Sequence, residues 1–220
     1  MTSPARENIL AKINKSLREH QLPKPFPEVE NKHDFFAKDD LSLEEKFVKE
    51  FTALGGKFVY CDNENEMMQQ LQALADTMNW STIHTKDHFL LQLFKDKEIN
   101  LVQPVIDMQN MEVGLSGCEC VVARTGSIIL SSAQDYGRSL PVYAPIHIAI
   151  AFTNQVVWNI SDSISFLDKK YGKDLPSMIS LTTGPSRTAD IEKTLVVGVH
   201  GPKEVYLFLV DSNWKDTENK

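Results

Sequence analysis

Between residues 57 and 94, short β-rich runs alternate with amphipathic helical stretches, and this rhythm leaves few folds open to the chain. The runs that predict strands are residues 57–61 and 81–85, and those that predict helices are residues 64–78 and 87–94. A β-α-β-α order is typical of a layered sheet that helices cover. The sequence therefore predicts an α/β fold with a Rossmann-like layered sheet.

The second half of the chain is richer in strands. Residues 119–124 (ECVVAR) and 127–131 (SIILS) flank Thr125-Gly126, which predicts a tight hairpin. Further strands are expected within residues 146–152, 155–158, 178–181, 195–199 and 205–210, with a short helix at residues 163–171. Because these strands are almost continuously apolar, we expect both of their faces to be covered.

The N-terminal region predicts helices outside this sheet. Ser3-Pro4 is a typical helix start, and an apolar stripe follows at helical spacing before three prolines between residues 23 and 27. A second helix is expected over residues 43–54, capped by Ser42 and ended by Gly55-Gly56. We therefore expect a helical extension at residues 1–55, the α/β domain at residues 56–214 and a polar tail at residues 215–220.

Charge and cysteine content exclude several classes of function. The 23 Lys and Arg residues against 30 Asp and Glu give a net charge of −7, which disfavours nucleic-acid binding. The uncharged stretch 139–161 contains prolines and amides, so no membrane span is expected. Because the chain lacks a secretory signal and has only three cysteines, we expect it to be cytoplasmic. Three thiols cannot ligate a [4Fe–4S] cluster alone, and no zinc motif is present, so we expect no metal and no cofactor in this chain.

Residues 182–192 carry the most unusual pattern. An apolar strand is followed by a Ser/Thr-rich turn and by Arg187, and a helix is expected to begin near residue 188 or 189. Asp190 and Glu192 would lie in its first turn. The N–H groups at such a start, with the Arg187 guanidinium, would bind an anion at the carboxyl end of the strand. A purely structural interpretation explains the same residues equally well. In it, Ser186, Thr188 and the two acids cap the helix, and Arg187 forms an ion pair with a neighbouring residue.

Three other segments could complete such a pocket. His200 ends a strand before Gly201-Pro202, where an imidazole would be exposed and could titrate near neutral pH. Arg138 and His147 flank buried strands and could face an acidic ligand. The hairpin tip, which includes Thr125, Gly126 and Ser127, offers backbone N–H groups as an anion nest. Taken singly, each residue also has a purely structural interpretation, as a turn, surface or core-edge residue.

Together these segments resemble one family. TGSIIL (residues 125–130), GPSRTADIE (184–192) and GVHGP (198–202), in this order, are similar to the lactate-utilisation protein C family, the LUD domain. The resemblance covers roughly residues 57–214 and implies a fold of the NagB/RpiA/CoA-transferase type. It also implies a part in oxidising L-lactate to pyruvate with two iron–sulfur partner proteins. Arg124 stands where family members often carry a glutamate. The role of that glutamate in the family is therefore not assigned to position 124 of this chain.

On that basis we expect the non-cluster subunit of a cytoplasmic L-lactate oxidation system, with the iron–sulfur clusters on its partners. Arg187 would hold a small carboxylate, and His200 would act as base or donor at the hydroxyl. Asp190 would orient a cation, with Arg138 and His147 completing the pocket. One alternative is an assembly or regulatory partner of the iron–sulfur subunits. The other is an enzyme acting on a phosphate- or CoA-bearing molecule, which would need a pocket carboxylate such as Glu119 or Glu192. The resemblance assigns no reaction to this chain itself.

Overall fold

The structure, a computed structural model, describes residues 4–19, 36, 40–135, 139–189, 195–198 and 201–211, without the side chains of residues 188, 189 and 195–197. The chain divides into two units, residues 1–39 and residues 40–220. The first contains the predicted helix α1 (Pro4–Glu19), which buries none of its residues. The predicted boundary at residue 55 stays a prediction.

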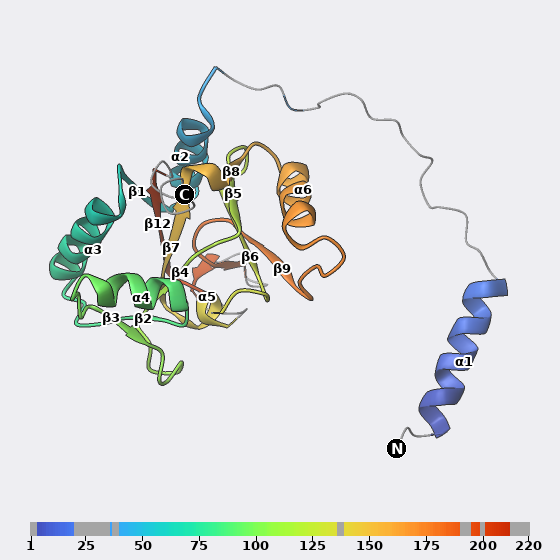
Figure 1. The fold of residues 1–220 in the computed structure, drawn as a ribbon. Coiled ribbons are helices and arrows are strands. Elements are labelled where there is room, and N and C mark those ends of the chain that lie inside the picture. Colours follow the sequence, from blue (N-terminus) through green and yellow to red (C-terminus); the bar gives the residue numbers. More distant parts are fainter. Residues whose placement is uncertain are drawn as a thin grey trace. The chain divides into compact units, whose positions relative to one another are not determined.

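The second unit is built on a six-stranded sheet in which every strand pair is parallel. The strand order is β1-β12-β7-β4-β2-β3 (Figure 1). These strands are β1 (Lys57–Cys61), β2 (Ile83–Thr85), β3 (Val102–Pro104), β4 (Val113–Ser116), β7 (Ile146–Phe152) and β12 (Glu204–Val210).

A second sheet of four strands lies on one face of the first, in the order β8-β5-β6-β9 (Figure 1). Its strands are β5 (Cys120–Val122), β6 (Ser127–Ser131), β8 (Val156–Val157) and β9 (Ile179–Thr182). The predicted hairpin between β5 and β6 is confirmed, with residues 123–126 forming the turn. A separate antiparallel pair, β10 (Arg187–Ala189) and β11 (Leu195–Val197), follows β9.

Helices cover both sheets. They are α2 (Leu43–Ala53), α3 (Glu64–Met78), α4 (His88–Asp96), α5 (Leu140–Tyr143) and α6 (Ile160–Tyr171), with a short 3₁₀ turn at Thr153–Gln155. The predicted cap of α2 is confirmed, because the Ser42 hydroxyl accepts from the Glu45 N–H and the Glu45 carboxylate accepts from the Ser42 N–H. The helix stops where Gly55 adopts a φ of +88°. No described helix is both long enough and apolar enough to cross a membrane.

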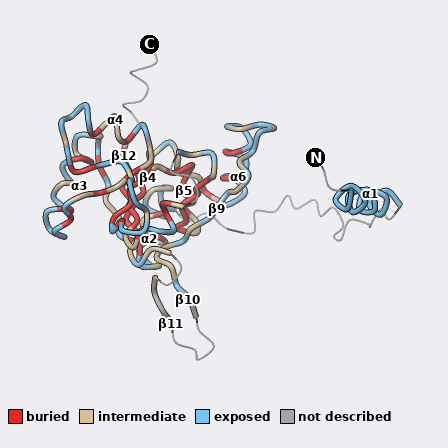
Figure 2. The backbone as a smooth tube through the Cα atoms, turned by 90° about the horizontal axis from the view of Figure 1, so that it is seen from below, coloured by how far each residue is buried: buried red, intermediate tan, exposed pale blue. Residues whose placement is uncertain are grey.

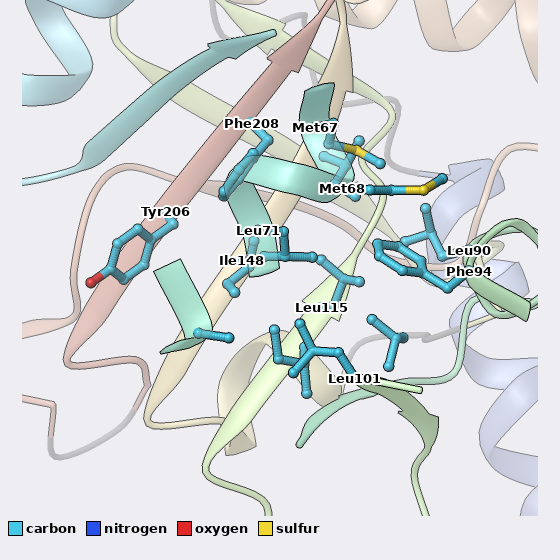
Figure 3. Close-up of a cluster of buried hydrophobic side chains, with 14 of the residues drawn as sticks. Met67, Met68, Leu71, Leu90, Phe94, Leu101, Leu115, Ile148, Tyr206 and Phe208 are labelled. Carbon is cyan, nitrogen blue, oxygen red and sulfur yellow. The ribbon is translucent and has the colours of Figure 1, made fainter. Parts of the chain in front are cut away.

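The core forms on both faces of the central strands. Alternate residues of β7 and β12 belong to two different apolar clusters. Ile148 and Phe208 pack in the first cluster with α3 and α4 (Figure 3). Ala149 and Leu207 pack in the second cluster with α2, α5 and the second sheet. Figure 2 shows that the buried residues, drawn in red, gather in the interior of this unit. The expectation of strands covered on both faces is therefore confirmed for β7 and β12.

The mixed α/β class with a mostly parallel sheet is confirmed, whereas the NagB/RpiA type stays a prediction. One local prediction is wrong: no helix begins at residue 188 or 189, because Arg187–Ala189 form β10 and pair with β11. A capping pattern is only a local signal, and here pairing with residues 195–197 prevails over it. The dipole of a helix therefore cannot supply the anion site predicted at this point.

The hairpin turn is fitted against α2 at Gly126. Its φ is +61°, and a Cβ there would lie 2.5 Å from the backbone nitrogen of Phe51. Gly126→Ala should therefore lower the free energy of unfolding by about 1–3 kcal/mol for overpacking, in addition to backbone strain. Urea unfolding measures the loss. Gly172→Ala is the control, because Gly172 also has a positive φ, of +56°, but open space around it. Equal losses in the two variants would contradict the close packing.

Candidate functional site

A cavity of about 400 Å³ lies where the loop after β9 meets the amino ends of β7 and β12. Its walls come from α5, from residues 182–187, from residues 201–202 and from the second residues of β7 and β12, His147 and Val205. Its volume is within the usual range for small-molecule sites, about 300–1,000 Å³. The cavity adjoins the carboxyl end of β9, where the sequence places the expected anion pocket. In the parallel sheet, however, the cavity lies at the amino ends of the strands.

Two of the predicted motifs form one wall of this cavity. The backbone N–H of Ser186 donates to the Pro202 carbonyl at 2.8 Å, and that of Gly198 donates to the Ser186 carbonyl at 3.0 Å. A Cβ on Gly201 would lie 3.0 Å from the Ser186 Cβ. These contacts hold residues 184–187 against Gly198 and residues 201–202, although β10 and β11 separate the two segments in sequence.

Arg187 lines the cavity and also contacts α2. Its Nη2 donates to the carbonyl of Leu54 at 2.6 Å, at the C-terminal end of the helix, where a cation is favoured. Within the described residues no carboxylate pairs with this guanidinium. A guanidinium has five N–H donors, so this single bond leaves donors for a ligand.

His147 is the one polar side chain at the start of β7, and it is 2% exposed. Its Nε2 lies 2.8 Å from the Oγ of Ser116 on β4. Burial lowers the pKa of His147 to about 4, because the surroundings cannot solvate an imidazolium. The ring is therefore neutral at pH 7 where it lines the cavity.

The predicted hairpin tip lies behind the cavity wall. The buried Ser127 hydroxyl is 2.7 Å from the Thr125 hydroxyl and 2.8 Å from the hydroxyl of Thr183, which lines the cavity. Gly126 packs against α2 instead. The structure therefore brings Ser186, Arg187 and His147 together around the cavity, with Ser127 touching its wall.

Other predicted site residues are not described in full. Thr188 lies in β10 and only its backbone is described. The remaining four lie outside the described residues: Arg138, Asp190, Glu192 and His200. The predicted proximity of His200 to Arg187 therefore stays a prediction.

Ser116 is the site residue that the sequence analysis missed. It is fully buried, and its hydroxyl donates to the Gly117 carbonyl at 2.9 Å while contacting His147. Its only signal in the sequence is a hydroxyl that ends an otherwise apolar strand, VGLS. That signal does not identify a partner 31 residues away.

Glu119, an expected pocket carboxylate in the enzyme alternative, does not line the cavity. Its fully buried carboxylate accepts from Ser131 at 2.6 Å, Tyr171 at 2.7 Å and Lys170 at 2.8 Å. Desolvation lowers the pKa of Lys170, but the hydrogen bond and charge of Glu119 outweigh it and raise that pKa overall. The network joins the hairpin to α6 and is a structural ion pair.

The cysteines and acids offer no reactive or metal centre in the described part of the chain. All three thiols are buried and unpaired. Burial raises the pKa of Cys61 and of Cys120 to about 12, and that of Cys118 well above its usual value, so all three stay protonated at neutral pH. Among the described residues no group of three or more His, Cys, Asp or Glu could hold a metal ion.

The fold and this cavity define a mixed α/β protein with a small-molecule-sized site between two sheets. A family model described as the LUD domain matches residues 44–210, and the chain belongs to this family. The resemblance noted in the sequence is thereby confirmed.

Curated relatives cover part of the chain. It is 36% identical over 106 residues to "Lactate utilization protein C" of Bacillus licheniformis and to that of Bacillus subtilis, and each match covers 47% of this chain and 44% of the relative. The chain thus spans less than half the length of these relatives. A crystal structure of a DUF162 family protein from Deinococcus radiodurans has a similar fold, with a TM-score of 0.56 and 18% identity, over 77% of this chain and 99% of that chain.

The buried imidazole makes stability depend on pH. The pKa of His147 falls from 6.5 to about 4 on folding, so the unfolded chain binds more protons between these values. The contribution of the neutral His147 to the free energy of unfolding is therefore complete above pH 6.5. It decreases by up to about 3 kcal/mol as the pH drops toward 4. Urea unfolding across this range should show a flatter profile for His147→Gln. Equal slopes in the wild type and in His147→Gln would contradict the shift.

The hydrogen bonds and ion pair of Glu119 should contribute to the stability of the fold, and not to ligand binding in the cavity. Glu119→Gln leaves Lys170 without its counter-ion, so we expect a loss of about 2–4 kcal/mol in the free energy of unfolding. Glu50→Gln removes the partially exposed Lys46–Glu50 pair of α2, at 2.9 Å, and should cost less than about 1 kcal/mol. Denaturant unfolding compares the two variants. Similar losses would refute a structural role for the Glu119 ion pair.

Proposed function

We propose that this chain is the non-cluster subunit of a cytoplasmic L-lactate oxidation system, and that the cavity beside β7 and β12 binds a small carboxylate. Support comes from the name of the Bacillus relatives, "Lactate utilization protein C", and from membership of the LUD domain family. The name belongs to proteins that the chain matches over less than half of their length, so the assignment rests equally on the cavity.

The observation that carries the proposal is the guanidinium of Arg187 at the cavity wall, with no carboxylate pairing with it in the described residues. Arginine binds carboxylates through two parallel N–H donors, which fixes the orientation of the anion as well as its position. Ser186 and Thr183 line the same wall and can add hydroxyl donors. This donor set suits a carboxylate better than a cation or a neutral ligand.

The proposed system divides its chemistry between subunits. A [4Fe–4S] cluster needs four thiolates, whereas this chain has three cysteines, and these belong to three different apolar clusters. The clusters would therefore belong to the partner subunits, and this chain would hold the carboxylate.

The alternatives receive less support. An enzyme that forms an acyl intermediate on a carboxylate would need an acid in the cavity, and none of the described residues that line the cavity is Asp or Glu. An assembly protein without a ligand would have no use for donors that face a cavity of this size. The effect of Arg187→Ala on carboxylate binding distinguishes a carboxylate-binding subunit from these alternatives.

Arg187→Ala should weaken the binding of L-lactate by roughly 10- to 100-fold, because a hydrogen-bonded charge contact contributes about 1.5–3 kcal/mol. Isothermal titration calorimetry of the full chain measures the dissociation constant. Arg187→Lys keeps the cation and should bind with intermediate affinity. Since Arg187 also contacts Leu54, the melting temperature of each variant is measured in parallel.

Arg124→Ala is the control for the loss of an arginine, because Arg124 donates to Asn159 at the start of α6 and does not line the cavity. It should bind lactate as the wild type does. Equal affinities in the wild type and in Arg187→Ala, or no binding of lactate or pyruvate by either protein, would overturn the proposed site.

A further inference from the structure

The hydrogen bonds of Ser116 indicate which ring nitrogen of His147 carries the proton. The Ser116 hydroxyl has one hydrogen, and it donates that hydrogen to the Gly117 carbonyl at 2.9 Å. The same oxygen lies 2.8 Å from His147 Nε2, a contact in which the tautomer of the ring decides the donor. With the Ser116 hydrogen on the Gly117 carbonyl, the tautomer that satisfies both contacts is Nε2–H, and Nδ1 then keeps its lone pair.

Nδ1 makes no hydrogen bond within the described part of the chain. The ring is 2% exposed and lines the cavity, whereas Ser116 does not. Because the two nitrogens of an imidazole point in different directions, the contact of Nε2 with β4 leaves Nδ1 for another partner. A ligand in the cavity that donates a hydrogen bond would satisfy this acceptor.

The cavity thus offers two complementary kinds of group. Arg187 and the hydroxyls of the residue 182–187 loop donate, which suits an anion. His147 accepts, which suits a ligand O–H. An ammonium group could also donate to Nδ1, but it would add a second cation to a cavity that already holds Arg187.

We propose that His147, oriented by Ser116, is a specificity-determining residue that makes this cavity select 2-hydroxy acids over 2-oxo acids and unsubstituted acids. This inference rests on the proposed function, since it requires that the carboxylate binds beside Arg187. A 2-oxo acid presents only lone pairs to Nδ1, and the two acceptors repel each other. An unsubstituted acid leaves Nδ1 unpaired.

The selection also has a consequence for turnover. The 2-oxo acid that corresponds to the substrate lacks the hydroxyl hydrogen that donates to Nδ1 in the ground-state complex. The product therefore binds more weakly than the substrate at the same carboxylate contact, which favours its release.

The test compares acids of one size on the full chain at pH 7.5: L-lactate, pyruvate, propionate and L-alanine. By calorimetry, the wild type should bind lactate at least tenfold more tightly than each of the other three acids. A longer 2-hydroxy acid, 2-hydroxybutyrate, should bind comparably to lactate, because the cavity of about 400 Å³ has room beyond three carbons.

Two variants separate the orientation of the ring from its presence. His147→Gln can keep an amide N–H toward Ser116, but its acceptor, Oε1, does not take the position of Nδ1, so lactate and propionate should bind with similar affinity. Ser116→Ala frees the ring to take the other tautomer, so the preference for lactate over pyruvate should shrink several-fold. In both variants the affinity for propionate should change less than the affinity for lactate, since Arg187 is unchanged.

Nitrogen-15 NMR of the histidine ring gives a readout that a merely structural role would not produce. In the free protein, His147 should show a protonated Nε2 and an unprotonated Nδ1, and lactate should shift the Nδ1 resonance more than propionate does. A protonated Nδ1 in the free protein would overturn the inference.

The binding results separate this inference from the proposed function. If lactate, propionate and pyruvate bind alike, and all three lose affinity in Arg187→Ala, the carboxylate site stands and the role of His147 is refuted. Alanine binding as tightly as lactate would refute selection for a hydroxyl. If none of the acids binds, both proposals fall.

Discussion

The burial of β7 and β12 on both faces is the constraint on which the other features of this protein depend. Each side chain of these strands must pack against helices on one side or against the second sheet on the other. A polar side chain on such a strand is costly unless a partner satisfies it. His147 meets this condition by staying neutral and contacting Ser116, so the same burial that stabilises the core sets the protonation state of the cavity.

The sequence predicts the elements whose signals are local. The cap at Ser42 and the stop at Gly55 delimit α2, and the apolar runs at residues 146–152 and 205–210 identify the buried strands. The β5–β6 hairpin is predictable for the same reason, since its two β-rich runs are separated by a turn former. In each case the residues that determine the structure are neighbours in the chain.

Predictions from the sequence fail where contacts between segments far apart in the chain determine the structure. Ser186 and the acids that follow it resemble a helix start, yet Arg187 pairs with Val197 in an antiparallel ladder. The position of the cavity in the parallel sheet was not predictable for a similar reason, because β9 belongs to the other sheet. Ser116 becomes a site residue only through the register that sets Gly114 opposite His147, and no local pattern encodes a register between strands 31 residues apart.

The charge of the chain explains why a bound carboxylate depends on the few donors that contact it directly. A net charge of −7 gives the chain a field that opposes the approach of an anion, but at physiological salt that field is screened over about 8 Å. An anion is therefore retained by donors in direct contact with it. Since His147 is neutral, it adds no charge, and the guanidinium of Arg187 is the cation among the described residues that line the cavity. Affinity and selectivity are then carried by separate residues: Arg187 provides attraction for any small carboxylate, and the neutral imidazole distinguishes one carboxylate from another.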